Sequence, residues 1–529
     1  MGAPSSRHGA RVLGAGGRSG VSAGREVRRR PVALPDSFRR LTRDSWDRWE
    51  RDIRSRPVGR PSGSAVEPGV SGRQPLVGTV GFGSGRARGG SVVSLDPPGG
   101  GRRPDVGTRQ PGTAPEVRGW LDPAVGALGL LALLAGFGQF GAVAALGDVA
   151  RSFGHVTGGS TLADRAGLSG TELGLGLAIL RLASLGALPL SGMADRLGRR
   201  TVLVVSCGAG LVCTALAAAS PGYWWFITIF ALGRPLLSTT SAIAQVAAAE
   251  QTASSDRAKA IALVTAGYGV GAGLTAVIYG LAERSLGFRG VFALAIVPLL
   301  VLPSLRRRVV EADRYRIAAA SKSHPLPVLG AIGPAFRRRL AVVLLLAFFV
   351  SVVTGPATSF VFLYAENVLG LAAAAAAVLV VAAGLVGLVG LLLGRFAADR
   401  IGRRTAGAIS MAGIALAAVL TYSGSRGGLI VGYELQILAA SSFAPAAGSL
   451  ANELFPTSVR ASVAGWNVAA SVLGATAGLL VFGAVADVGN RFATGALVVS
   501  LPAVLAAGLF FLLPETKGRE PEELWPVLG

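Results

Sequence analysis

Three ionisable side chains lie inside long apolar stretches of the sequence, where a charge is unexpected. Arg181, Arg234 and Glu434 are each surrounded mostly by apolar residues. A charge at the centre of a bilayer costs roughly 2.5–3.5 kcal/mol on insertion scales, so each should face a cavity or a partner. We expect Arg181 and Arg234 to line a pathway and to hold an anionic group or tune a carboxylate. Glu434 is the candidate proton carrier. Structural ion pairs between helices are the alternative interpretation.

Uncharged polar residues in the same stretches are the candidate hydrogen-bond partners of a solute. Gln139 is the main deep polar group of the first apolar run, and the others are Thr354, Gln436 and Asn467. Contacts between helices explain each of them equally well. Asp148 and Glu172 lie near the edges of their runs, where water reaches them, and can serve only as an outer relay.

No arrangement of residues points to catalysis or to a metal site. The histidines His8, His155 and His324 all fall outside the apolar runs. Cys207 and Cys213 are six residues apart, about 9 Å along a helix axis, which is too far for a disulfide. No Ser/His/Asp constellation is visible. The sequence therefore predicts a protein that is not an enzyme and has no cofactor and no metal.

The composition requires that much of the chain lies in lipid. The 529 residues are 51% hydrophobic and 15% charged, with a mean hydropathy of +0.54, whereas soluble domains carry about 25% charged residues. Runs of about 20 apolar residues can cross the hydrocarbon core, and their backbone must be helical because lipid offers no hydrogen-bond partners. We place twelve spans at 124–147, 172–191, 201–219, 223–247, 260–282, 290–305, 340–364, 371–393, 405–421, 428–450, 462–485 and 493–513.

Basic residues predict the orientation of these spans. With the N-terminus inside, the inner loops after residue 118 carry 21 basic residues and the outer loops carry six. Cytoplasmic loops are enriched in Lys and Arg, so we expect both termini in the cytoplasm. The abundance of Arg, Ala, Gly and Pro suggests a GC-rich bacterial gene. The expected location is the bacterial inner (plasma) membrane, crossed many times.

Residues 1–118 differ from the rest of the chain. They are rich in Gly, Pro, Ser and Arg and contain no lysine, and such a segment cannot bury enough apolar surface to offset its ordering entropy. We expect a disordered extension. A basic stretch around Trp46 and Trp49 is compatible with a surface helix on a membrane or nucleic acid, although a solvated tail is the simpler interpretation. We expect no nucleic-acid partner.

A short motif occurs twice. The sequence Asp-Arg-Leu-Gly-Arg-Arg begins at Asp195, and Asp-Arg-Ile-Gly-Arg-Arg begins at Asp399, 204 residues later. An offset of half the membrane region predicts two six-helix halves, 119–305 and 340–513. A cytoplasmic linker, 306–339, joins them, and a cytoplasmic tail, 514–529, follows. Two such halves suggest alternating access around a site near mid-membrane.

Several motifs together resemble the major facilitator superfamily, in its sugar- and metabolite-porter-like branch. They are Gly192 to Arg200; Gly233-Arg234 with Glu250 and Arg257; Asn452 to Arg460; and Pro514 to Arg519. The second copy of the first motif departs from the signature, because Phe396 takes the place of its glycine. The resemblance implies an all-α, twelve-helix secondary transporter of a small organic solute. We expect proton-coupled symport, and proton-driven efflux of a drug or metabolite is the alternative. We expect a monomer in the bilayer.

The same motifs imply a cytoplasmic gate. Charge clusters at these loops can form in one conformation and break in another, and we expect them to act as a latch for the outward-open state. The alternative is that the arginines only fix the topology. The candidate gate residues are Gly192, Asp195, Arg196, Arg199, Arg200, Glu250, Arg257, Asp399, Arg400, Arg403, Arg404, Glu453 and Arg460.

Overall fold

The computed structural model describes residues 119–159, 161–252, 256–309, 334–487 and 491–519, together with residues 523 and 525, and all the regular structure in these ranges is helical. Residues 1–118, which we expected to be disordered, lie outside the described residues. So do most of the expected linker and the end of the expected tail.

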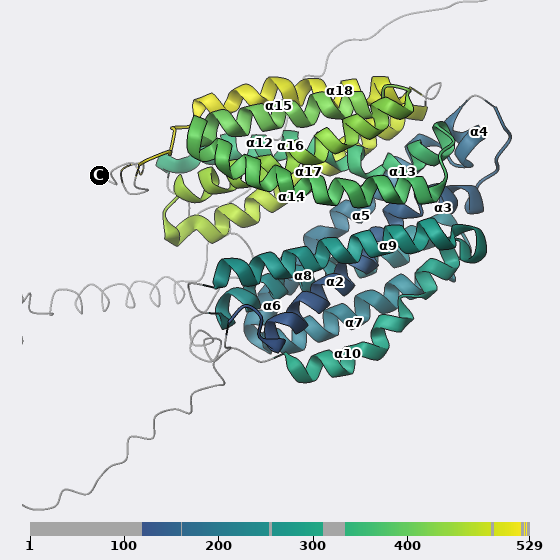
Figure 1. Ribbon diagram of the computed structural model, residues 1–529, viewed down its shortest axis with the longest axis horizontal. Helices are drawn as coiled ribbons and strands as arrows, with labels where there is room; N and C mark the ends of the chain where they lie inside the picture. The colour runs from purple at the N-terminus through teal and green to yellow at the C-terminus, as the bar shows by residue number, and fades with distance from the viewer. Residues whose placement is uncertain are drawn as a thin grey trace, which may run out of the picture. The chain divides into compact units, whose positions relative to one another are not determined.

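The helices follow one another with short connections (Figure 1). The first set comprises α2 (Pro123–Ala144), α3 (Leu146–Phe153), α4 (Leu162–Ala166), α5 (Gly170–Ala183), η1 (Ser184–Gly186), α6 (Ala187–Leu197), α7 (Arg199–Ala217), α8 (Tyr223–Gln251), α9 (Arg257–Ala293) and α10 (Ile296–Arg308). The second set comprises α12 (Pro334–Ser359), α13 (Val361–Leu363), η3 (Tyr364–Val368), α14 (Ala373–Ile401), α15 (Arg403–Thr421), α16 (Arg426–Glu453), α17 (Thr457–Asp487), α18 (Phe492–Ala507) and η5 (Gly508–Leu512). We call these the first and second helix sets.

Eleven helices among the described residues are long and apolar enough to cross a membrane. They match eleven of the twelve expected spans. The remaining one, 290–305, is divided between the end of α9 and the 13-residue α10. The chain kinks inside α9 at Gly287, where φ is +56° and ψ is −174°. Essentially only glycine adopts this backbone conformation, so the glycine at this position determines where the kink lies.

Side chains at the helix ends explain several boundaries. Asp122 accepts a hydrogen bond from the Ala124 amide at 2.8 Å, and Pro123 follows it at the first helical position of α2. Ser169 and Glu172 form a reciprocal capping box at the start of α5. A carboxylate or hydroxyl that satisfies the first free amides fixes where a helix begins.

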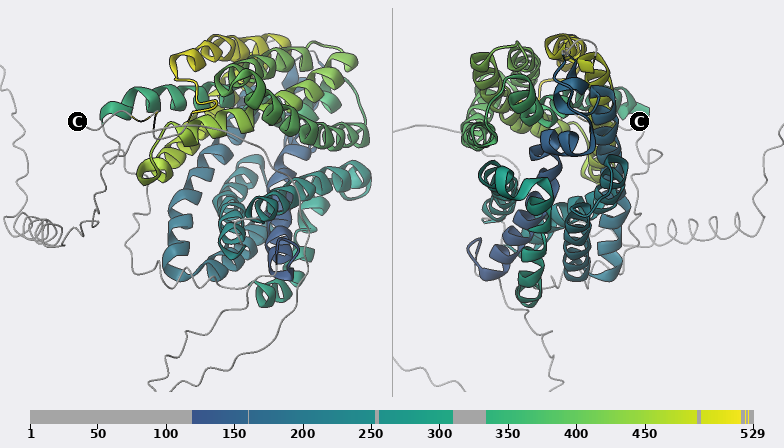
Figure 2. Two further views of the ribbon diagram at one scale, coloured as in Figure 1. Left: turned by 60° about the vertical axis from the view of Figure 1, so that its left-hand side comes forward. Right: turned by 90° about the vertical axis from the view of Figure 1, so that its right-hand side faces the viewer.

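Among the described residues, the buried core joins the two helix sets at one end. One apolar cluster runs from Val125 to Val309 and contains residues of the first set alone. A second, larger cluster combines the second set with residues of the first set, such as Phe226, Tyr279 and Phe292. α3, α4 and α13 lie at the right-hand end in Figure 1, and the second cluster crosses between the sets there. Figure 2 shows the two sets from further sides.

Candidate functional site

Arg181 and Arg234 lie close together in the first helix set. Their guanidinium groups are near enough to repel each other, and both are near the Tyr268 hydroxyl. Arg234 donates to the Gln139 carbonyl oxygen at 3.2 Å and to Ser184 Oγ at 3.4 Å. Within the described ranges, neither arginine has a carboxylate within 4.0 Å. The expected pairing of these residues with a carboxylate is therefore not seen there.

A break in the helix positions this pair. Arg181 lies in the last turn of α5, next to the 3₁₀ turn η1 that separates α5 from α6. A Cβ on Gly186 would lie 3.0 Å from Pro235 Cβ, so α8 packs tightly against the break. A mid-helix 3₁₀ stretch often marks a hinge or a functional position. The arrangement brings Arg181 from one helix and Arg234 from another to the same level.

Gln139 adds an unused hydrogen-bond donor. The residue is 4% exposed, and its Nε2 has no partner in the part of the chain that the structure describes. Its Oε1 accepts from Ser238 Oγ at 3.4 Å, while its backbone carbonyl holds Arg234. A buried amide donor without a partner costs about 1–3 kcal/mol, which a ligand oxygen can recover.

The second helix set contains the other candidate pathway residues. Gln436 is fully buried, and neither of its side-chain amide atoms has a partner. Glu434 is half-buried, with Oε2 unpartnered, and Thr354 accepts through its carbonyl a hydrogen bond from Thr358 Oγ1.

A mostly apolar cavity of about 240 Å³ opens between α12, α16, α17 and η5. Asn467 and Ser471 are its polar side chains, and Phe443 and Phe510 lie among its apolar ones. Of the expected pathway residues, this cavity contains Asn467.

The repeated motif builds the same local structure twice. Gly198 and Gly402 end α6 and α14 with φ of +89° and +95°, a region that favours glycine. Arg199 forms an ion pair with Glu250 in the first set, and Arg403 forms one with Glu453 in the second. Each pair lies within its own helix set.

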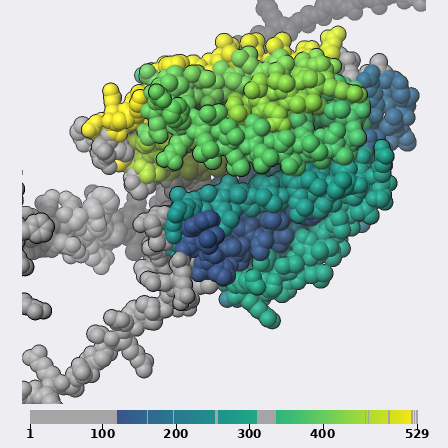
Figure 3. Space-filling model, viewed as in Figure 1, coloured from purple at the N-terminus to yellow at the C-terminus, as the bar shows by residue number. Residues whose placement is uncertain are grey.

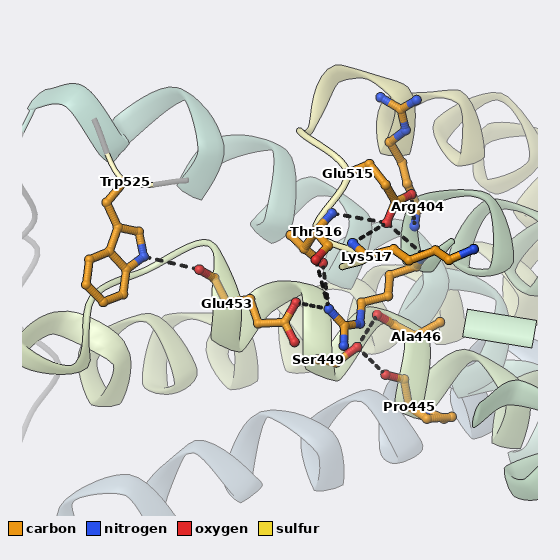
Figure 4. A network of polar contacts seen from close by, with 10 residues as sticks. Arg404, Pro445, Ala446, Ser449, Glu453, Glu515, Thr516, Lys517 and Trp525 are labelled. Atoms are coloured by element: carbon orange, nitrogen blue, oxygen red, sulfur yellow. Dashed lines mark hydrogen bonds and ion pairs between the residues drawn. The ribbon is translucent and has the colours of Figure 1, made fainter. Parts of the chain in front are cut away.

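The polar network that contains Glu453 also includes Glu515 and Thr516, which are among the last described residues (Figure 4). Arg403 Nη1 also donates to the carbonyl and hydroxyl oxygens of Thr516, both at 3.2 Å. The Glu515 carboxylate accepts from the backbone N–H groups of Arg403 at 2.9 Å and Arg404 at 3.2 Å, and so caps α15. Burial raises the pKa of Glu515, but the backbone donors, including those of Lys517 and Thr516, outweigh it and hold the pKa below its ordinary value.

The remaining gate residues do not join one cluster. Asp399 and Arg400 are exposed, and the Arg400 guanidinium lies 5.2 Å from the centre of the Phe396 ring. Arg257 donates to the Ala249 carbonyl oxygen in the last turn of α8, and Arg460 donates to the Phe455 carbonyl oxygen just before α17. Arg200 Nε donates to the Arg306 carbonyl oxygen. Gly192 is half-buried in α6, while the side chains of Asp195 and Arg196 lie outside the described residues.

Polar and ring contacts between the two helix sets, as far as the structure describes them, lie toward the opposite end. Asp487 accepts from the Gly170 amide at 3.0 Å and from Thr171 Oγ1 at 3.1 Å. The ring of Phe362 lies edge-on to Phe140 and Tyr279. In the space-filling view α14 (green) and α9 (teal) meet along the visible face (Figure 3).

Sequence reasoning overlooked Tyr268 near the two arginines, and the buried Glu366 at the end where the sets meet. Glu366 is a single carboxyl group directly after the expected span 340–364. A single carboxyl group directly after an apolar run was a signal in the sequence for Glu366. Tyr268 lies within the glycine-rich run from Gly267 to Gly273 and carried no signal.

A family model described as "Major Facilitator Superfamily" matches residues 128–422 and 389–526. The chain belongs to this superfamily. It is therefore a multi-pass membrane transporter for small molecules rather than an enzyme.

Individual proteins resemble the chain more distantly. A protein of Cupriavidus pinatubonensis (strain JMP 134 / LMG 1197) named "Probable 4-methylmuconolactone transporter" is 26% identical over 372 residues, which cover 68% of this chain and 85% of that protein. The structure of a D-xylose-proton symporter matches with a TM-score of 0.62 at 19% identity, covering 76% of this chain and 100% of the other. The inward open xylose transporter XylE from E. coli matches at 0.59 and 20%, covering 76% and 99%. At these identities the structures support the fold alone.

Proposed function

We propose that this transporter takes up a small organic anion across the bacterial inner membrane by alternating access, in symport with protons. Its helix sets form the two six-helix halves of a twelve-helix fold, with the end of α9 and α10 as the sixth helix. The observation that carries the proposal is the pair Arg181 and Arg234, which lacks a carboxylate partner among the described residues.

Two adjacent cations in a membrane are costly unless an anion joins them. Each half-buried guanidinium loses part of its hydration, and the two repel each other. A bound carboxylate offsets both the lost hydration and the repulsion through charge-assisted hydrogen bonds, which are stronger than neutral ones. The Gln139 Nε2 group is a third donor at this place. The relative named as a 4-methylmuconolactone transporter supports a small organic molecule as the solute.

The contacts between the halves support the assignment of the structure to one of the two states of alternating access. Edge-to-face ring contacts and hydrogen bonds hold the halves together at the end with α3 and α4, whereas the ion pairs that the structure describes at the arginine-rich end stay within each half. The positive-inside rule places the arginine-rich end in the cytoplasm. The structure then corresponds to the inward-facing state, and the charge clusters act as a latch only in the opposite state. Glu434 carries the coupled proton in this proposal, because it is the half-buried carboxyl group of α16 with an unpartnered oxygen.

Binding to Arg181 variants tests the solute class. The purified protein in detergent is titrated with small organic acids, including 4-methylmuconolactone, and with D-xylose and nucleosides, and thermal stabilisation is recorded. A charge-assisted hydrogen bond is worth about 1.5–3 kcal/mol, so Arg181→Gln should weaken binding of an organic anion by about 10- to 150-fold. Arg181 suits this test because its side chain makes no hydrogen bond within the described chain, whereas the side chain of Arg234 holds the Gln139 carbonyl oxygen and Ser184.

The matched control is Arg284→Gln, which removes an exposed arginine of α9 and should leave binding unchanged. Binding of sugars or nucleosides but not of anions would refute the organic-anion proposal. Equal binding by wild type and Arg181→Gln would remove Arg181 from the site. Stabilisation by lipophilic cations alone would instead support efflux.

A further inference from the structure

One carboxyl group lies buried where the two helix sets meet. Glu366 belongs to the π-helical turn η3, and its side chain is only 4% exposed. Its Oε1 has no hydrogen-bond partner among the residues that the structure describes. π-helical turns occur frequently at functional sites.

Arg151 lies close to three carboxylate groups at this place. Arg151 Nη2 lies 2.7 Å from Glu283 Oε1, and 3.9 Å from both Glu366 Oε2 and Asp148 Oδ1. These residues come from α3, α9 and η3, so the cluster joins the two helix sets. If all three carboxyl groups were ionised, the cluster would carry two uncompensated negative charges in a partly buried position.

Glu366 is the group best placed to take up a proton. Asp148 accepts a hydrogen bond from the Phe288 amide at 2.6 Å, and Glu283 accepts the short bond from Arg151, so each of these two side chains already has an N–H donor. Glu366 has only a 3.5 Å contact with the Tyr279 hydroxyl. Burial raises its pKa to about 8; the charges of Glu283 and Asp148 act in the same direction, and Arg151 acts against them.

The other described residues around Glu366 add no positive charge that would compensate the carboxylates. A Cβ on Gly147 would lie 2.5 Å from Asn367 Oδ1 and 3.3 Å from Glu366 Oε2, so both oxygens face this glycine. Asn367 Oδ1 is also unpartnered. The chain at Arg165 contributes its carbonyl oxygen to Asn367, and the Arg426 guanidinium is directed at the Leu369 carbonyl oxygen.

We propose that Glu366 is a proton-binding site, and that a proton on its carboxyl group holds the two helix sets together at this end. The ligand is the proton itself, since no group of three or more His, Cys, Asp or Glu residues in the described chain is placed to hold a metal ion. The proposal rests on alternating access, because it requires a second state in which this end opens. It does not depend on the identity of the solute.

Proton linkage gives the direction and size of the effect. When this end opens, water reaches Glu366, and its pKa returns toward the ordinary value of about 4.3. The closed state binds the proton more tightly, so acid favours closure. The ratio of closed to open molecules should change by up to about tenfold per pH unit between about pH 4.3 and about pH 8.

The experiment measures the opening directly. Spin labels are placed at Val156→Cys and Gly427→Cys, one exposed position on each helix set at this end, with Cys207 and Cys213 replaced by alanine. The distances between the two spin labels are measured by double electron–electron resonance. The full chain is used in lipid nanodiscs, without solute, from about pH 5 to about pH 9. In the wild type the short-distance population should grow as the pH falls. Glu366→Gln, which imitates the protonated carboxyl group, should keep the short distance at every pH.

The matched control is Glu172→Gln, because Glu172 is a capping carboxylate at the same end, paired with Ser169. It should retain the wild-type pH response. A pH-independent wild type, or an unchanged pH response in Glu366→Gln, would overturn the proton site. If an organic anion still shifts the label distances in that case, the proposed anion transport stands although the proton site is refuted. If Glu366→Gln does not fold, infrared titration of the wild type with labelled glutamate decides, since a protonated carboxyl band should disappear near pH 8.

Discussion

The close approach of α5 and α17 allows a prediction from a single methyl group. A Cβ added to Gly483 would lie 2.4 Å from the Gly170 carbonyl oxygen and 3.0 Å from Gly174 Cα. Both atoms belong to the backbone and cannot rotate away, so Gly483→Ala must push the two helices apart at the closed end. In the state where this end is open, the same methyl group has room.

The cost of the methyl group sets the expected shift. Overpacking a tight contact costs about 1–3 kcal/mol, so the ratio of open to closed molecules should rise by about 5- to 160-fold. The spin labels at Val156 and Gly427 measure this ratio as the long-distance fraction.

Gly384→Ala is the matched control, because a Cβ at Gly384 on α14 would meet nothing within 4 Å. It should leave the distance distribution at its wild-type form. If Gly483→Ala and Gly384→Ala give the same distribution, the packing of α5 on α17 does not hold this end closed and the reasoning fails.

Three further predictions concern single contacts. Glu453→Gln should lower the free energy of unfolding by about 1 kcal/mol, because it removes the charge that faces Arg403 in a partly buried ion pair; an unchanged thermal midpoint in detergent would contradict it. Glu515→Gln should lose about 0.3–1 kcal/mol at neutral pH, since a carboxylate stabilises a helix N-terminus. Because the folded-state pKa of Glu515 is depressed, this difference should persist above the ordinary value of about 4.3 and vanish as the pH falls through the depressed value, which thermal melts across acid pH can follow. Gly287→Ala should destabilise by about 1–3 kcal/mol through backbone strain at the kink, whereas Gly269→Ala, where a Cβ meets open space, should not; equal melting points would show that the kink is tolerated without glycine.

The sequence was informative where a single physical rule dominates. Long apolar runs can only be helices in lipid, and eleven of the expected spans appear as helices. The expected span 290–305 is not among these eleven, because it is divided between the end of α9, after the kink at Gly287, and α10. Among the candidate gate residues Arg199 pairs with Glu250 and Arg403 pairs with Glu453, while the expectation of a latch between the halves stays a prediction.

Side-chain contacts between distant helices were beyond the sequence. Arg181 and Arg234 are 53 residues apart in the chain, and their proximity depends on how α5 breaks at η1 and how Pro235 packs against Gly186. Glu366 looked like an ordinary loop carboxylate, because its burial is created by α3 and α9. Hydropathy reports depth in the membrane, whereas the partner of a side chain depends on the rotation of each helix.

The most direct measurement is uptake of a labelled organic acid into proteoliposomes under an imposed proton gradient, acidic on the outside. The account predicts accumulation that a protonophore abolishes. Glu434→Gln should lose accumulation but keep solute exchange, and Arg181→Gln should lose both. Accumulation that ignores the gradient, or an Arg181→Gln protein that transports like the wild type, would contradict the proposal of proton-coupled organic-anion transport.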